Sequence, residues 1–240
     1  DFVEVTNEDL YSNIALEISR GKVVGWFQDA MEWGPRALGN RSILADPRNA
    51  EMQQKLNLKI KFRESFRPFA PIVLKDYAQE YFKNCSESRF MQFTFNICDN
   101  HTLINDKPFK TTKLEDRVKI PRSTLPAITH LDYSARVQTV SKETNLAYWN
   151  LINEFRKITG VPVVLNTSFN NNVEPIVNTI DDAICCFLTT DLDFLVIDSV
   201  IISKKDFIKN VSLLKTLEIT LPNTKKLVLR QNKNSNLDYS

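Results

Sequence analysis

The sequence predicts an α/β protein in which a mixed sheet is flanked by helices. Short apolar segments of strand length alternate with segments whose apolar residues recur every three to four positions. The 240 residues are 42% hydrophobic and 25% charged, which is typical of a globular chain that can bury a sizeable core. No apolar run reaches the roughly 18 residues that a membrane-spanning helix needs, and no signal peptide opens the chain.

The first half of the chain contains clear helix and strand signals. Thr6 can cap a helix that Gly21 ends. Asn49 can cap a second helix that extends to Ile60. Apolar runs predict strands at 22–27, 42–45, 68–74 and 90–97, and a short helix at 76–82.

The second half continues the alternation after a polar segment at 99–124, which predicts a long loop or lid. Helices are expected at 145–159, ended by Gly160, and at 180–189. Strands are expected at 161–168, 193–203 and 226–230, and strands or a β-bend at 127–131 and 135–140. We therefore expect one domain over 1–205 and a partly mobile C-terminal extension over 206–240.

Cysteine and histidine usage excludes several kinds of site. No C-x-x-C spacing occurs among Cys85, Cys98, Cys185 and Cys186. We interpret them as reduced thiols of a cytoplasmic protein, with the adjacent pair buried in a helix. The only histidines are His101 and His130, which argues against a Cys/His metal cluster and against histidine-dependent nucleophilic catalysis. Whether His130 lines a site or packs at a strand end stays open.

Residues 32–42, EWGPRALGNRS, concentrate glycine, proline and arginine. Two of the chain's five glycines, Gly34 and Gly39, lie here. Glycines let backbone amides approach an anion closely. Arg36 and Arg41 add planar forks that suit phosphate or carboxylate oxygens. We interpret this loop as one wall of an anion pocket.

Further cations gather next to this loop. Eight basic residues occur within 32 positions, although the formal net charge of the chain is only +2: Arg36, Arg41, Arg48, Lys55, Lys59, Lys61, Arg63 and Arg67. In an extended segment Lys61 and Arg63 would share one face, and Phe62 would point into the core. The alternative interpretation of this cluster is a solvated basic face.

Two polar clusters follow later in the chain. Asn166, Thr167, Ser168 and Asn170 come at the end of an apolar strand, which suits a ligand site at the carboxyl end of a sheet; the alternative is a turn with Asx caps. Arg136 alternates with Gln138 on another predicted strand, so both should leave one face. No G-x-S-x-G elbow surrounds Ser168, and no Walker or Rossmann motif occurs.

Four stretches together resemble the C-terminal domain of the NodU/CmcH-type O-carbamoyltransferases: 23–48 (VVGWFQDAMEWGPRALGNRSILADPR), 59–74 (KIKFRESFRPFAPIVL), 126–140 (PAITHLDYSARVQTV) and 159–170 with 174–177 (TGVPVVLNTSFN and EPIV). The resemblance implies a YrdC-like fold, a twisted mixed sheet around a positively charged cavity. It also implies a domain that makes carbamoyl-adenylate from carbamoyl phosphate and ATP with Mg²⁺. In this family a separate N-terminal kinase-like domain with a His-rich metal site passes the carbamoyl group to a hydroxyl. The start at Asp1 and the few histidines fit the absence of that domain.

The resemblance also assigns roles to residues. The family's K-x-R motif corresponds to Lys61 and Arg63, expected to bind ATP phosphates, and its S-x-N motif to Ser168 and Asn170, expected at phosphate or ribose, directly or through Mg²⁺. Arg36, with Lys61 and Arg63, is expected to be catalytic. The other substrate- or nucleotide-binding residues are expected to be Arg41, Arg67, Arg136, Asn166 and Thr167. Adenylation needs fixed cations more than a protein nucleophile, and no metal ligand from a protein side chain is expected.

Two departures from the family pattern stand near these motifs. Asp29–Ala30 replaces a usual Gly-Arg, and Val173 replaces a common glycine, which forbids easy positive φ. We expect either to weaken anion binding or to mark a divergent substrate.

Two rival functions remain open: a catalytically silent domain that supports its transferase half, and a module that binds RNA or nucleotides through its cations. Nucleic acid is disfavoured because the aromatic residues among the cations are expected to face the core rather than stack on bases. The expected partners are carbamoyl phosphate and the missing N-terminal domain. A homodimer is left open, and no membrane is expected.

Overall fold

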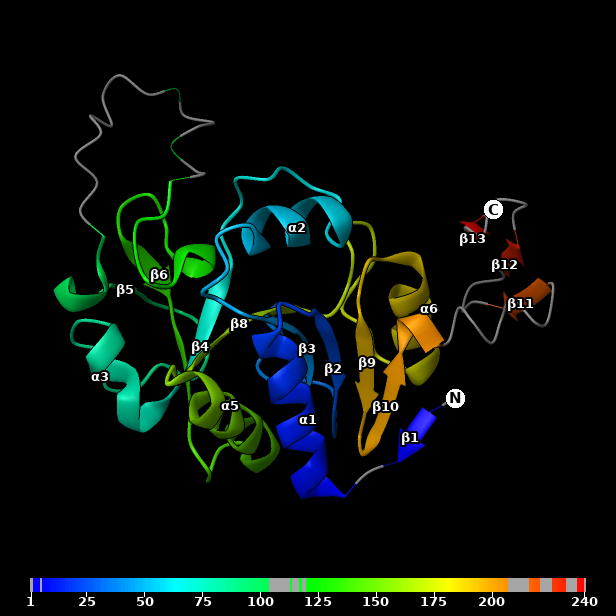
Figure 1. Ribbon diagram of the computed structural model, residues 1–240, viewed down its shortest axis with the longest axis horizontal. Coiled ribbons are helices and arrows are strands. Elements are labelled where there is room, and N and C mark those ends of the chain that lie inside the picture. Colours follow the sequence, from blue (N-terminus) through cyan, green and yellow to red (C-terminus); the bar gives the residue numbers. More distant parts are fainter. Residues whose placement is uncertain are drawn as a thin grey trace.

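The computed structural model describes residues 2–4, 6–103, 113, 117, 120–206, 216–220, 226–231 and 237–239. Its main sheet is mixed and contains eight strands in the order β1-β10-β9-β2-β3-β8-β4-β7 (Figure 1). Helices pack on both faces of this sheet. The predicted fold class, α/β with a mixed sheet flanked by helices, is therefore confirmed.

The strands of the main sheet are β1 (Phe2–Glu4), β2 (Val24–Phe27), β3 (Arg41–Ala45), β4 (Ala70–Leu74), β7 (Gln138–Val140), β8 (Val163–Ser168), β9 (Phe194–Ile197) and β10 (Val200–Ser203). β2 runs parallel to β9 and β4 runs parallel to β7, whereas the other neighbours are antiparallel. Every residue of β2, β3 and β4 is buried. Burial on both faces explains why these strands read as continuous apolar runs.

The helices divide between the two faces. α1 (Asn7–Ser19) and α5 (Leu146–Thr159) cover one face, where Leu10 and Phe155 share a core with Val164. α2 (Met52–Lys59), α3 (Ala78–Tyr81) and α6 (Ile180–Thr189) belong to the other face, where Leu56 and Phe187 share a core with Leu165. Alternate residues of β8 thus pack in two separate hydrophobic cores, because successive side chains of a strand point to opposite faces of the sheet.

Helix ends follow the predicted signals with one exception. Thr6 accepts a hydrogen bond from the amide of Asp9, and Gly21 and Gly160 take positive φ of 81° and 76° after α1 and α5. Asn49 does not cap α2, whose N-cap is Glu51. Oδ1 of Asn49 instead accepts from the amide of Glu51, the residue immediately before the helix. The cap prediction at Asn49 was wrong because this local turn comes first.

The other predicted elements are present in part. The strand expected at 127–131 is wrong, since Pro126–Ile128 forms a 3₁₀ turn. The segment 90–97 contains only β5 (Thr94–Asn96), which pairs with β6 (Ser134–Arg136) in a small separate sheet. The expected short helix divides into a 3₁₀ turn, Lys75–Tyr77, followed by α3. Much of the loop predicted at 99–124 lies outside the described residues.

The C-terminal extension contains three described strands, β11 (Thr216–Thr220), β12 (Lys226–Gln231) and β13 (Leu237–Tyr239), in a sheet of their own. The strand predicted at 226–230 is confirmed by β12. The prediction of a mobile end falls partly on residues outside the described part of the chain.

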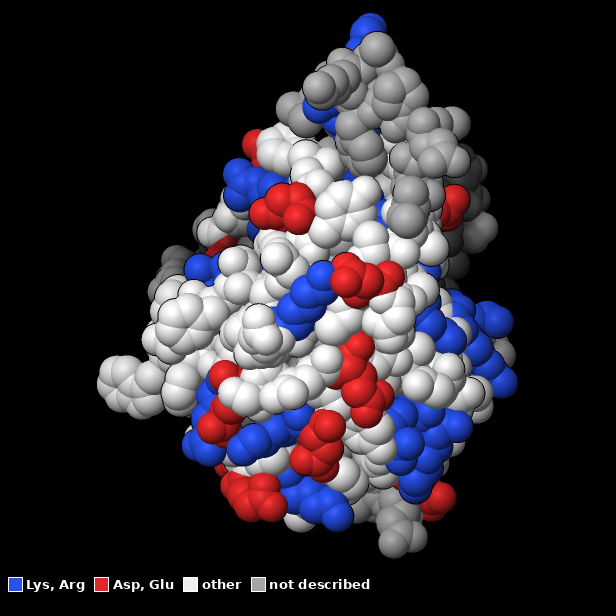
Figure 2. Space-filling model, turned by 90° about the vertical axis from the view of Figure 1, so that its left-hand side faces the viewer, with Lys and Arg blue, Asp and Glu red and all other residues white. Residues whose placement is uncertain are grey.

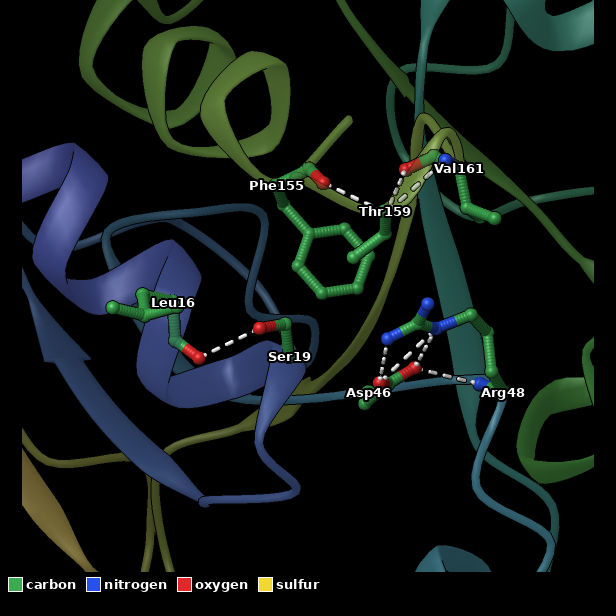
Figure 3. A network of polar contacts seen from close by, with 7 residues as sticks. All are labelled: Leu16, Ser19, Asp46, Arg48, Phe155, Thr159 and Val161. Carbon is green, nitrogen blue, oxygen red and sulfur yellow. Dashed lines mark hydrogen bonds and ion pairs between the residues drawn. The ribbon is translucent and has the colours of Figure 1, made fainter. Parts of the chain in front are cut away.

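Short polar contacts hold the ends of α1, β3 and α5 (Figure 3). The hydroxyl of Ser19 donates to the carbonyl of Leu16 at 2.7 Å, and that of Thr159 donates to the carbonyl of Phe155 at 2.7 Å. Arg48 donates to both carboxylate oxygens of Asp46, with 2.6 Å between Nη2 and Oδ2. The charge of Arg48 is thereby paired with that of Asp46.

Candidate functional site

A cavity of about 120 Å³ lies where β8 ends and β4 begins. Three segments far apart in the sequence each contribute an arginine to its wall: Arg36, Arg63 and Arg136. The end of β8 contributes Asn166, Thr167 and Ser168, and the apolar part of the wall includes Pro68, Phe69 and Met91. No acidic side chain lines the cavity. The arrangement concentrates positive charge beside neutral hydrogen-bonding groups.

The three arginines form no ion pair within the described part of the chain. Burial lowers the pKa of Arg136, and the positive charge of Arg36 lowers it further. The buried Nε of Arg136 has no hydrogen-bond partner among the described residues. Unpaired cations that repel one another make this wall favourable for a bound anion.

Arg63 is positioned by a residue that carried no recognisable sequence signal. Its Nε donates to Oδ1 of Asn57 on α2 at 2.7 Å, and its guanidinium carbon lies 5.1 Å from the centre of the Phe69 ring. Nδ2 of Asn57 in turn donates hydrogen bonds to the carbonyls of Ser65 and Arg67. One asparagine thus connects α2 to the segment that returns toward β4 and fixes the direction of Arg63.

The EWGPRALGNRS loop is organised by Glu32, which sequence reasoning missed. Its Oε1 accepts from the amides of Leu38 and Asn40 at 2.8 Å and 2.7 Å, and its Oε2 accepts from the amide of Arg41 at 3.2 Å. Burial raises the pKa of Glu32, and the three amides oppose that rise. By tying the end of the loop back to its start, Glu32 makes the loop project Arg36 into the cavity wall. The sequence feature that could have indicated this role of Glu32 was an acidic residue at the start of a basic motif.

Arg41 and Arg67 lie elsewhere. Arg41 is only 4% exposed, its guanidinium carbon is 3.5 Å from the centre of the Phe27 ring, and it donates to the carbonyls of Gln28 and Asn40. Burial lowers its pKa. Arg67 forms a surface ion pair with Glu64 at 2.8 Å. Neither lines the cavity, so only two of the eight clustered cations do.

Lys61 joins the two family motifs to each other. It is 3% exposed, and its Nζ donates to the carbonyls of Ser168 and Asn170 at 2.5 Å and 2.8 Å and to Oδ1 of Asn170 at 2.9 Å. Ser168 in turn donates its hydroxyl to the same Oδ1 at 2.7 Å. Burial lowers the pKa of Lys61 to about 7. Lys61 and Asn170 therefore lie behind the cavity wall, and Ser168 is the member of this group that lines it.

The expectation that Phe62 points into the core was wrong. Phe62 has a positive φ of 46° and is 55% exposed. The chain turns at this residue instead of running as a strand, so Lys61 and Arg63 do not share a face. Phe66 is also exposed, whereas Phe69 is buried. The aromatic residues among the cations therefore divide between surface and core.

Phe169 anchors the S-F-N motif beneath the central strand β2. A Cβ built on Gly25 would lie 2.7 Å from Cζ of the Phe169 ring. The amide of Phe169 donates to the carbonyl of Arg41 at 2.9 Å, and its own carbonyl accepts from Val177 at 2.9 Å. Because only glycine leaves room for the ring, Gly25 lets Phe169 hold Ser168 at the cavity.

Two buried amide side chains support the loop from below. Nε2 of Gln138 donates to the carbonyl of Leu38 at 2.7 Å, and Nδ2 of Asn166 donates to the carbonyl of Ala37 at 3.0 Å. The two amides also bond to each other at 2.9 Å. Arg136 and Gln138, predicted to act from one strand, belong to β6 and β7 of two different sheets, yet both contribute to this region.

The two departures from the family pattern do not reach the cavity lining. Asp29 takes a positive φ of 48°, a backbone conformation that glycine adopts more easily, and its Oδ1 accepts from the amide of Ala30. Val173 is 86% exposed and is not among the described residues with positive φ. Val173 therefore does not need the positive φ that a glycine at this position would permit.

Histidine and cysteine side chains have structural surroundings. His130 contacts the hydroxyl of Ser134 through Nδ1 at 3.2 Å and does not line the cavity. All four cysteines are free, and Cys98 alone is not fully buried. Among the described residues no group of three or more His, Cys, Asp or Glu side chains could hold a metal ion. No helix in the described ranges is long and apolar enough to cross a membrane.

Comparison with known proteins places these motifs in a family. Residues 15–204 match the family model described as carbamoyltransferase C-terminus. The chain is 49% identical over 201 residues to nodulation protein NolNO of Sinorhizobium fredii, covering 82% of this chain and 27% of that protein. It is 47% identical over 199 residues to an uncharacterized protein of Synechocystis sp., covering 83% of this chain and 32% of that protein.

The chain thus spans about a third or less of the length of these relatives. Among solved structures, full-length HypF in its phosphate- and nucleotide-bound form matches with a TM-score of 0.47 at 14% identity, covering 85% of this chain and 22% of that one. The match to the family model extends over most of the chain and includes all three cavity arginines. The chain belongs to the family of carbamoyltransferase C-terminal domains.

Proposed function

We propose that this chain is the carbamoyl-adenylate-forming part of a longer O-carbamoyltransferase that uses carbamoyl phosphate and ATP. One observation carries the proposal: three guanidinium groups from separate segments converge on one cavity whose lining contains no acidic side chain. Such a wall stabilises negative charge that is already on the ligand and charge that moves onto phosphate oxygens during the reaction. Family membership supplies the carbamoyl chemistry.

The proposed reaction has two steps, each of which balances in atoms. Carbamoyl phosphate reacts with water and gives carbamate and inorganic phosphate. A carbamate oxygen then attacks the α-phosphorus of ATP, the bond from that phosphorus to the β-phosphate oxygen breaks, and pyrophosphate leaves. Arg36, Arg63 and Arg136 would hold the phosphate group of the first substrate and offset the charge of the leaving group. No protein nucleophile is needed.

The cavity volume of about 120 Å³ suits a phosphate-sized group rather than a whole nucleotide, since pockets for larger organic ligands measure about 300–1,000 Å³. The nucleoside of ATP would therefore extend out of this cavity. Mg²⁺ would arrive on the nucleotide phosphates, because it is commonly bound through substrate phosphates and water. Ser168 and Thr167 at the cavity wall are hydroxyl groups that could complete its coordination.

On one face of the molecule, the distribution of charge favours a small anionic substrate over RNA. On the face shown in Figure 2, Lys and Arg side chains are interrupted by Asp and Glu instead of forming a continuous basic surface. A backbone-tracking nucleic-acid site would need a continuous stripe of cations. We propose that the carbamoyl group is then passed to a hydroxyl by a separate domain of the longer protein, in the cytoplasm.

The test is pyrophosphate release by the purified chain with ATP, Mg²⁺ and carbamoyl phosphate. We expect release above that of a reaction without carbamoyl phosphate, and loss of that excess in Arg136→Ala. Arg20→Ala is the matched control, because Arg20 pairs with Glu17 on the surface of α1. Equal release with and without carbamoyl phosphate by the folded wild-type chain would overturn the proposal for this domain.

A further inference from the structure

Asn166 carries an unused hydrogen-bond acceptor at the cavity. The residue is 1% exposed, it lines the cavity, and its Oδ1 has no hydrogen-bond partner among the described residues. A buried carbonyl oxygen without a partner costs roughly as much as a lost hydrogen bond. In a wall that otherwise presents cations and hydroxyls, such an acceptor is out of place for a ligand that offers only anionic oxygens.

The orientation of the Asn166 amide follows from its neighbours. Its Nδ2 faces the carbonyl of Ala37, which can only accept, so the amide cannot be turned the other way without placing two acceptors together. The orientation of the Gln138 amide is fixed in the same way, because its Nε2 donates to the carbonyl of Leu38 and its Oε1 accepts from Nδ2 of Asn166. Both donor positions of the Asn166 amide are therefore used, and Oδ1 is left as an acceptor.

The strand register places Asn166 beside another residue of the cavity lining. Asn166 in β8 is directly paired with Ala70 in β4, and paired residues on adjacent strands direct their side chains to the same face. Ala70 lines the same cavity. The buried Nε of Arg136, which also lines the cavity, is an unused donor. Among the buried side-chain atoms of the described cavity lining, one donor and one acceptor are thus without a partner.

We propose that Asn166 selects the substrate by accepting a hydrogen bond from its N–H group while the arginines hold its phosphate. The matching class of ligand is a small acyl phosphate that carries an amino group on its acyl carbon, as carbamoyl phosphate does. This inference rests on the proposed function and adds the group that distinguishes the carbamoyl from the acetyl analogue. Acetyl phosphate has the same size and charge, but it places a methyl group where the amino group would be.

A pair of stable phosphonates isolates this contact. Phosphonoacetamide and 2-oxopropylphosphonate differ only in an amino group in place of a methyl group, and both keep the phosphonate. Their dissociation constants for the wild-type chain can be measured by isothermal titration calorimetry. We expect phosphonoacetamide to bind roughly 5- to 150-fold more tightly, the range that corresponds to a buried acceptor left without its partner.

The variant Asn166→Ala should lower this preference to within about twofold of unity, because the acceptor is gone. Asn153→Ala is the matched control, since Asn153 lies on α5 and contacts Arg156, and it should keep the wild-type preference. If Asn166→Ala does not fold, the ratio of the two dissociation constants for the wild-type chain alone tests the proposal. Equal affinities in the wild type, or an unchanged preference in a folded Asn166→Ala, would refute the role of Asn166. Binding of neither phosphonate and of no inorganic phosphate would instead refute the proposed function of the cavity.

Discussion

Gly39 and Gly34 allow a sharp test of how the EWGPRALGNRS loop is held. Both have positive φ, 127° at Gly39 and 95° at Gly34. A Cβ on Gly39 would lie 2.2 Å from Cδ1 and 2.7 Å from Cε1 of Tyr148, whereas a Cβ on Gly34 would meet nothing within 4 Å. Tyr148 is completely buried and cannot swing away. Alanine at Gly34 therefore adds backbone strain alone, and alanine at Gly39 adds strain and a steric overlap.

The magnitudes follow from these two terms. Backbone strain of this kind costs of order 1–3 kcal/mol, and forcing an extra carbon into a packed core costs typically about 1–3 kcal/mol. Gly39→Ala should thus destabilise the chain by about 1–3 kcal/mol more than Gly34→Ala. Each kcal/mol lowers Tm by roughly 2–4 °C for a chain of this size. Differential scanning calorimetry of the two variants measures the difference.

A second measurement links the loss to the ring of Tyr148. Combining Gly39→Ala with Tyr148→Ala removes the overlapping atoms, so the double variant should be less destabilised than the sum of the two single variants. Gly34→Ala combined with Tyr148→Ala should be additive. Equal Tm values for Gly39→Ala and Gly34→Ala, or additivity in both pairs, would refute the packing argument.

Three further predictions concern charged groups. Glu32→Gln replaces a carboxylate that accepts three backbone amides and should lower the free energy of unfolding by about 1–3 kcal/mol; an unchanged urea midpoint would contradict this. Burial lowers the pKa of Lys61 to about 7. The unfolded chain therefore binds more protons than the native chain between pH 7 and about 10, and stability rises with pH there by up to about 1.4 kcal/mol per unit. Lys61→Met should remove this rise in the free energy of unfolding between pH 7 and pH 9, as measured by urea titrations at both pH values. An unaltered rise would contradict the lowered pKa of Lys61. Burial alone would raise the pKa of Asp193, but the Val23 amide and the Lys22 and Lys55 ammonium groups lower it. The ionised Asp193 carboxylate should thus stabilise the folded chain above about pH 4, and this stabilisation should fade as acid protonates the folded carboxylate. The difference in free energy of unfolding between the wild type and Asp193→Asn, followed by circular dichroism, should therefore narrow below that pH. A difference that stays constant into acid would oppose this assignment.

Local signals in the sequence accounted for most of the helices and buried strands. The helices after Thr6 and before Gly160 were predictable because capping and positive φ depend on a few neighbouring residues. The buried strands were predictable because burial on both faces leaves continuous apolar runs. Phe62 was mispredicted because its positive φ is imposed by the turn after α2, where the amide of Arg63 donates to the carbonyl of Asn57. A two-residue periodicity argument assumes an extended chain, and it fails wherever the chain turns.

The site was predictable as a region but not in its detail. Arg36 and Arg41 are the same residue type in one loop, yet the first lines the cavity and the second stacks on Phe27. That choice depends on which distant segment packs beside each side chain, which spacing along the chain does not encode. Met91 lines the cavity without any motif to mark it. The positions of individual groups therefore emerge only from tertiary packing.

The bridge from Lys61 to Ser168 and Asn170 has a consequence for mutagenesis. The side chains of the three residues form a triangle of hydrogen bonds, so removing any one of them takes a partner from each of the other two, although Lys61 keeps its bonds to the carbonyls of Ser168 and Asn170. Effects of residues that act as a unit are strongly non-additive. In an alanine scan, the three separate losses should sum to more than the loss in the triple variant. Ranking these residues by their individual losses would count one shared network three times.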